Sequence, residues 1–138
     1  MAGPVTIDPE RHQRKADFGF ATERDLPAYL GIMGVLHREP INSSFARLLA
    51  GQLKGEDGVA LAHVLEEIAV LARHHLIAQD LLFDAFAIDR YWDQLAGVVG
   101  EIRSRTENPK FCENFELCGD AARLYRLDRP ALGESEGL

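Results

Sequence analysis

Apolar residues recur every three or four positions through most of the chain, which is the spacing of one face of an α-helix. The longest such stretch runs from Val59 to Ala96 and contains no glycine or proline. The apolar positions in it follow the 3.6-residue helical period: Leu61, Val64, Leu65, Ile68, Leu71, Ala72, His75, Leu82, Phe83 and Phe86. This pattern predicts a long helix at the centre of the molecule.

The length of this central segment raises a geometric problem. A continuous helix over residues 57–88 is about 48 Å long, whereas a compact globule of this chain length is about 37 Å across. The helix must therefore bend or break near Gln79 and Asp80, or project and be covered by a partner. A second apolar series lies on its opposite face: Val70, Ile77, Leu81 and Ile88. Two apolar faces predict neighbours on several sides, or a dimer.

Four further helices flank the central one. The first begins after Thr22 or Asp25 and stops at Pro40, with Leu26, Leu30, Met33 and Leu36 at helical spacing. The second begins at Asn42 or Ser43 and ends at the turn 54–58. The third begins after Asp89 and ends before Asn108-Pro109. The fourth begins near Phe111, and its apolar residues at helical spacing are Phe111, Phe115, Cys118, Ala122 and Tyr125.

These elements predict an all-α fold, a single-domain bundle of about five helices with a long central helix. The helical domain spans residues 18–127. Residues 1–17 and 128–138 are expected to be flexible tails, because they contain proline and glycine but little apolar periodicity. Composition agrees, since 18 Leu and 17 Ala stand against 7 Val, 7 Ile and 3 Thr.

Charge and composition exclude several classes of function. The net charge is −7 and no cluster of cations occurs, so nucleic-acid binding is not expected. No apolar run reaches the roughly 20 residues of a membrane span, and no secretory signal is evident, so we expect a cytoplasmic protein without a membrane partner. Cys112 and Cys118 point to different faces of a helix, which favours two buried free thiols over a disulfide.

The histidines are the candidates for metal or ligand binding. His63 and Glu67 share one helix face, where an imidazole and a carboxylate can bind a transition metal. His74 is too far along the helix to join them, so a simple exposed pair is the favoured interpretation. His75 falls on the apolar stripe and is expected to be a core histidine, with His74 pointing away.

An acidic series, Asp80, Asp84, Asp89 and Asp93, is the candidate for partner binding. As a solvated face it would attract a protein with a basic surface. Beside it, Trp92 is expected in the core. An exposed Tyr91 would contact the partner together with Asp80, Asp84 and Asp93, but packing of the aromatic pair in the core is the favoured alternative.

No nucleophile elbow, P-loop, dinucleotide fingerprint or zinc-protease motif occurs in the chain. The leading hypothesis is therefore a non-catalytic protein–protein interaction or regulatory module that presents exposed helix faces, acts as a homodimer and needs no cofactor. The alternative is a metal- or small-ligand-binding helical bundle, of enzymatic or other use, built on His63, Glu67, His74 and His75 with a transition metal.

Overall fold

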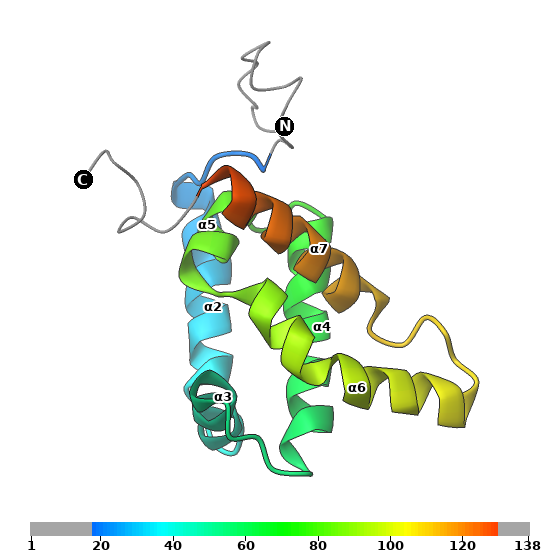
Figure 1. The fold of residues 1–138 in the computed structure, drawn as a ribbon. Coiled ribbons are helices and arrows are strands. Elements are labelled where there is room, and N and C mark those ends of the chain that lie inside the picture. The colour runs from blue at the N-terminus through cyan, green and yellow to red at the C-terminus, as the bar shows by residue number, and fades with distance from the viewer. Residues whose placement is uncertain (1–17, 130–138) are drawn as a thin grey trace.

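Helices make up the regular structure of the part of the chain that the structure describes. The computed structural model describes residues 18–129, and within them it contains no strand. A 3-10 turn at Glu23–Asp25 is followed by six α-helices, shown in Figure 1: α2 (Leu26–Leu36), α3 (Ile41–Ala50), α4 (Asp57–Arg73), α5 (Gln79–Ala85), α6 (Ile88–Thr106) and α7 (Glu113–Asp128). The predicted all-α single domain is confirmed. The predicted tails lie outside the described residues, except for Asp128, which belongs to α7, and Arg129.

Helices α4, α6 and α7 form the centre of the bundle. Helix α7 packs along both α4 and α6, and Figure 1 shows it crossing them on its way back towards the N-terminal end of α2. Leu65, Leu95 and Phe115, one from each helix, are almost fully buried where the three meet. None of the helices in residues 18–129 combines the length and the apolar character that a bilayer crossing requires.

The long central segment is divided into two helices. Helix α4 ends at Arg73, and His75 adopts a left-handed conformation with φ of 60°. The amide of His75 donates to the carbonyl of Ala72 at 3.2 Å, and the amide of Leu76 donates to that of Leu71 at 2.9 Å. This is the Schellman arrangement, in which the left-handed position is usually glycine. The break makes six helices out of the expected five and leaves α4 short enough to lie inside the bundle.

A distant carboxylate fixes the start of the next helix. Asp25 accepts a hydrogen bond from the amide of Ala78 at 2.7 Å and another from the amide of Thr22 at 2.8 Å. Asp80, in the first turn of α5, accepts one from the amide of Ala21 at 3.3 Å. The segment before α2 therefore caps the seven-residue α5, which supplies the buried side chains of Leu82 and Phe83 to the core.

Helix α7 is also capped from another helix. Glu66 of α4 accepts hydrogen bonds from the amide of Phe115 and from the side chain of Asn114, both at 2.8 Å. A carboxylate at a helix N-terminus satisfies amides that have no partner within the helix. Cys112, at the start of α7, and Cys118, within it, are buried free thiols, as predicted.

Candidate functional site

Helix α2 is apolar around its whole circumference. Its sequence, LPAYLGIMGVL, contains no charged side chain, and the hydroxyl of Tyr29 is its one polar group. Ile32 and Leu36 are buried, and Ala28 and Tyr29 pack partly against the core. These four residues form the side of α2 that faces the rest of the molecule.

The opposite side of α2 faces solvent and is just as apolar. Leu26 is 53% exposed and Leu30 is 56% exposed. Together with four further exposed residues they form a surface that we call the α2 face: Leu26, Pro27, Leu30, Gly31, Gly34 and Val35. At about 100° per residue these positions span about half of the helix circumference. Contiguous exposed apolar surfaces are unusual on monomeric proteins and mark sites of association.

The three exposed leucines of α7 lie in a different setting. Helix α7 exposes Leu117, Leu124 and Leu127. The exposed charged residues Asp120 and Arg123 lie between them in the helix. Apolar residues scattered among charges are normal on a protein surface, so the α2 face is the more distinctive feature.

Helix α2, which carries the α2 face, lies at one edge of the bundle (Figure 1). The main helical neighbour of α2 is α3. The ring of Tyr29 also approaches that of Phe86, with centroids 6.3 Å apart. The position of the α2 face therefore depends on how firmly α3 is held.

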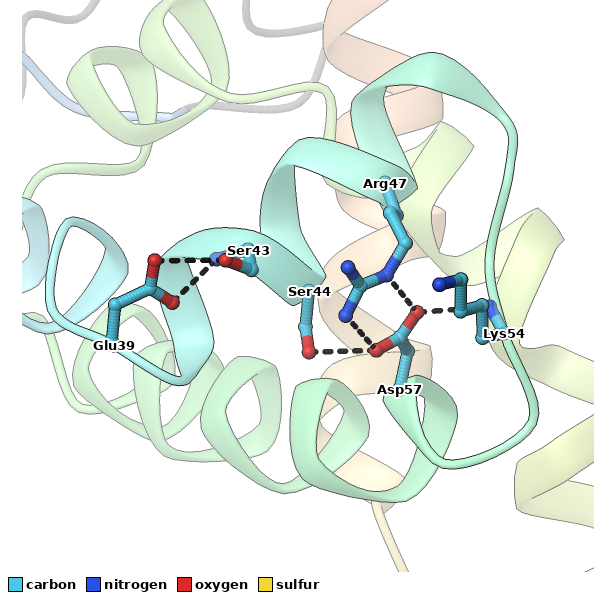
Figure 2. A network of polar contacts seen from close by, with 6 residues as sticks. All are labelled: Glu39, Ser43, Ser44, Arg47, Lys54 and Asp57. Carbon is cyan, nitrogen blue, oxygen red and sulfur yellow. Dashed lines mark hydrogen bonds and ion pairs between the residues drawn. The ribbon is translucent and has the colours of Figure 1, made fainter.

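A buried carboxylate holds α3 to the start of α4. Asp57, which is 1% exposed, accepts two hydrogen bonds of 2.7 Å from the Arg47 guanidinium. It accepts two more, each of 2.8 Å, from the hydroxyl of Ser44 and the amide of Lys54 (Figure 2). The Arg47 guanidinium and these other donors hold the pKa of Asp57 far below its usual value. A carboxylate with four donors stays ionised and fixes α3, the following loop and α4 together.

The turn between α2 and α3 is held by a second carboxylate. Glu39 accepts hydrogen bonds from the amide of Ser43 at 3.1 Å and from its hydroxyl at 2.8 Å (Figure 2). These hydrogen bonds lower the pKa of Glu39. Because the amide of Ser43 is in the first turn of α3, Glu39 caps that helix from the connecting turn. Helix α2 is thus joined to α3 through an ordered turn.

The candidate metal ligands do not converge. His63 and Glu67 are both exposed, and their side chains approach to 3.6 Å as a pair on one helix face. No group of three or more His, Cys, Asp or Glu side chains within residues 18–129 is placed to hold a metal ion. His74 and His75 are both exposed at the end of α4. The expectation that His75 lies in the core is wrong, because the helix ends at Arg73, two residues earlier, and its periodicity no longer applies.

The carboxylates of the acidic series bind partners on other parts of the chain, which the expected solvated face did not include. Asp84 accepts a hydrogen bond of 2.6 Å from the hydroxyl of Tyr125, and Asp93 forms an ion pair of 2.9 Å with Arg123. Asp80 accepts hydrogen bonds from two amides, and its burial raises its pKa. Asp89 is buried and forms an ion pair with Arg126. These carboxylates tie α5 and α6 to α7 or to the N-terminal segment.

Tyr91 lies in the core, and Trp92 packs against the core as a partly buried side chain. Tyr91 is buried, with its ring edge-on to that of Phe45 at 5.6 Å, whereas Trp92 is only half-buried. Trp92 packs edge-on against Phe115 at 5.1 Å. Tyr91 is therefore a core residue, and it is not available as an exposed contact.

The apolar series Leu26, Leu30, Met33 and Leu36 predicts the helix but not the α2 face. Of these four residues only Leu36 is buried. A helix that is apolar on every side gives no indication of which side faces solvent. The absence of any charge in residues 26–36 was the available signal.

Comparisons with known proteins reach only part of the chain. Residues 54–120 match a family model described as a domain of unknown function, DUF4760. The match covers just under half of the chain, from the loop before α4 to the first half of α7, and leaves α2 and α3 outside. Neither the curated proteins nor the solved structures yield a match.

Proposed function

We propose that this protein is a non-catalytic interaction module that forms a homodimer through the α2 face. The observation that supports this is the α2 face itself, six exposed residues without a single polar side chain. Apolar surface removed from water stabilises a complex by roughly 25 cal/mol per Å² before the costs of association. Helix α2, which is joined to α3 through an ordered turn and exposes an apolar face, is therefore suited to packing against another apolar surface.

A second copy of the chain is the partner that fits best. With a net charge of −7, two copies repel each other across most of their surfaces. The α2 face has no charge, so two copies can approach there without placing like charges in contact. The same face on a second copy also provides an apolar surface of matching size. Closed two-fold dimers are the commonest assembly of this kind.

Sedimentation velocity of the full chain tests the proposal. We expect a species of twice the 15.3 kDa chain mass at about 100 µM. Leu30→Asp places a charge at the centre of the α2 face and should give a monomer, because burying an unpaired carboxylate is costly. Circular dichroism should remain helical, since the Leu30 side chain contributes little to the core.

The matched control is Leu127→Asp, which introduces the same charge at an exposed leucine of α7. This variant should sediment as the wild-type dimer. A wild-type chain that is monomeric at about 100 µM overturns the proposal. A dimer that survives Leu30→Asp and dissociates with Leu127→Asp also overturns it, because the contact is then on α7.

A further inference from the structure

Two glycines in α2 have no explanation within the described part of the chain. Gly31 and Gly34 lie in the helix interior, and neither has a positive φ. A Cβ atom added at either position meets nothing within 4 Å among the surrounding residues. Glycine in a helix interior costs about 1 kcal/mol relative to alanine. The fold of residues 18–129 therefore gains nothing from these glycines, and both lie on the α2 face.

We infer that two copies pair α2 against α2 in antiparallel orientation, about a two-fold axis between Leu30 and Gly31. This inference rests on the proposed homodimer and specifies its geometry. Antiparallel pairing centred there places Leu30 opposite Gly31 of the second copy, and Pro27 opposite Gly34. Leu30 and Pro27 each meet a glycine, and Leu26 meets Val35 of the second copy at both ends of the face. The two backbones therefore approach closely at the glycines, where the larger side chains fill the space that is left.

The charges at the two ends of α2 fit the same arrangement. Glu23 precedes the helix and Arg38 follows it, at equal numbers of residues from the proposed axis. Both residues are exposed, and within residues 18–129 neither has an ion-pair partner. In the antiparallel pair, Glu23 lies beside Arg38 of the second copy at both ends of the interface. Parallel pairing instead places Glu23 beside Glu23 and Arg38 beside Arg38.

The orientation is tested by engineered disulfides. Within one chain, positions 23 and 38 are about 22 Å apart along the helix axis, so they cannot form an internal disulfide. In the double variant Glu23→Cys/Arg38→Cys, mild oxidation should give a covalent dimer linked from position 23 to position 38. Neither single variant should crosslink, because its two cysteines lie at opposite ends of the antiparallel pair. The linked peptides are identified by mass spectrometry, which separates them from products of Cys112 and Cys118.

Charge reversal provides an independent test. Glu23→Lys alone and Arg38→Glu alone should each weaken the dimer about tenfold, because each replaces two attractive pairs with two repulsive ones. The variant carrying both changes should recover the wild-type dissociation constant. At about 1 M salt the differences should largely vanish, because exposed charges are screened.

The outcomes separate this inference from the proposed function. A dimer that is crosslinked by either single cysteine variant is parallel, which overturns the inference and leaves the homodimer intact. A dimer with no crosslink in any variant, and with no response to charge reversal, also overturns the antiparallel register alone. A monomeric wild-type chain overturns both.

Discussion

The close contact between α6 and α7 at Gly119 predicts that a larger residue there destabilises the fold. A Cβ atom at this position would lie 3.0 Å from Cβ of Trp92 and 3.3 Å from its Cγ. The Trp92 Cβ is attached to the backbone of α6, so no side-chain rotation can move it away. The ring is also confined, because it packs edge-on against Phe115. Gly119→Ala therefore requires the two helices to separate by a few tenths of an ångström.

Two opposing effects determine how much Gly119→Ala changes the free energy of unfolding. Overpacking a well-packed core costs about 1–3 kcal/mol. Alanine gains about 1 kcal/mol over glycine in a helix interior. We expect Gly119→Ala to lower the free energy of unfolding by about 1 kcal/mol, the middle of the range that these values leave. Gly100→Ala in α6 is the matched control, because a Cβ there meets nothing within 4 Å and the helical gain acts alone.

Urea unfolding of both variants at one protein concentration measures the difference. The two variants share the helical gain, so the gap of about 1–3 kcal/mol between them isolates the cost of packing against Trp92. Trp92 is the one tryptophan of the chain, and its fluorescence reports directly on this contact. Equal stabilisation of both variants would refute the reasoning, because it would mean that α6 and α7 separate freely.

Three further predictions concern the buried polar groups and thiols. The lowered pKa of Asp57 stabilises the fold above the pKa of the unfolded carboxyl, and this contribution is lost as pH falls towards the folded pKa. The urea midpoint of Asp57→Asn should therefore lie below wild type at pH 6, with a gap that narrows by pH 3; a constant gap contradicts this. Arg126→Met leaves the buried carboxylate of Asp89 unpaired. It should lower the free energy of unfolding by only about 1–3 kcal/mol, because the Arg126 side chain is itself 39% exposed. Arg123→Met removes the partner of the exposed Asp93 and should change the urea midpoint little. If the two arginine variants are equally stable, burial does not decide the cost. Burial raises the pKa of Cys112 to about 11 and that of Cys118 to about 12, so a thiol reagent at pH 8 should label both only after unfolding, and rapid labelling of the native protein would contradict this.

The helical character of the chain could be predicted from the sequence because apolar spacing reports which side of a helix is covered. The stripe Phe115, Cys118, Ala122 and Tyr125 is buried as the spacing indicates. The break between α4 and α5 could not be predicted in the same way. The end of α4 is marked by a histidine in a left-handed conformation, and the start of α5 is fixed by Asp25, which lies 53 positions before its hydrogen-bond donor Ala78. Neither feature is accompanied by a glycine or proline, the residues that usually mark the end of a helix in a sequence.

The α2 face is harder to predict from the sequence for a related reason. Periodicity identifies an apolar series, but α2 carries two, and only tertiary packing decides that Ile32 is covered while Leu30 is exposed. Spacing along the chain also does not reveal the partners of the acidic series on other helices, where Asp84 and Asp93 are exposed but Asp89 is buried. Asp84 meets Tyr125 and Asp89 meets Arg126, both from α7.

The capping of α5 by Asp25 links two stretches of chain that are far apart in sequence. A helix of seven residues is too short to persist in water by itself. The amide of Ala78, just before the helix, and that of Asp80, in its first turn, are satisfied by Asp25 and by the carbonyl of Phe18 only when the segment carrying these two residues has returned to meet them. The amide protons of α5 should consequently exchange with solvent together with those of residues 21–25, as one cooperative opening unit. In folding, this small helix is among the last parts of the chain to gain order, because its order waits for a long loop to close.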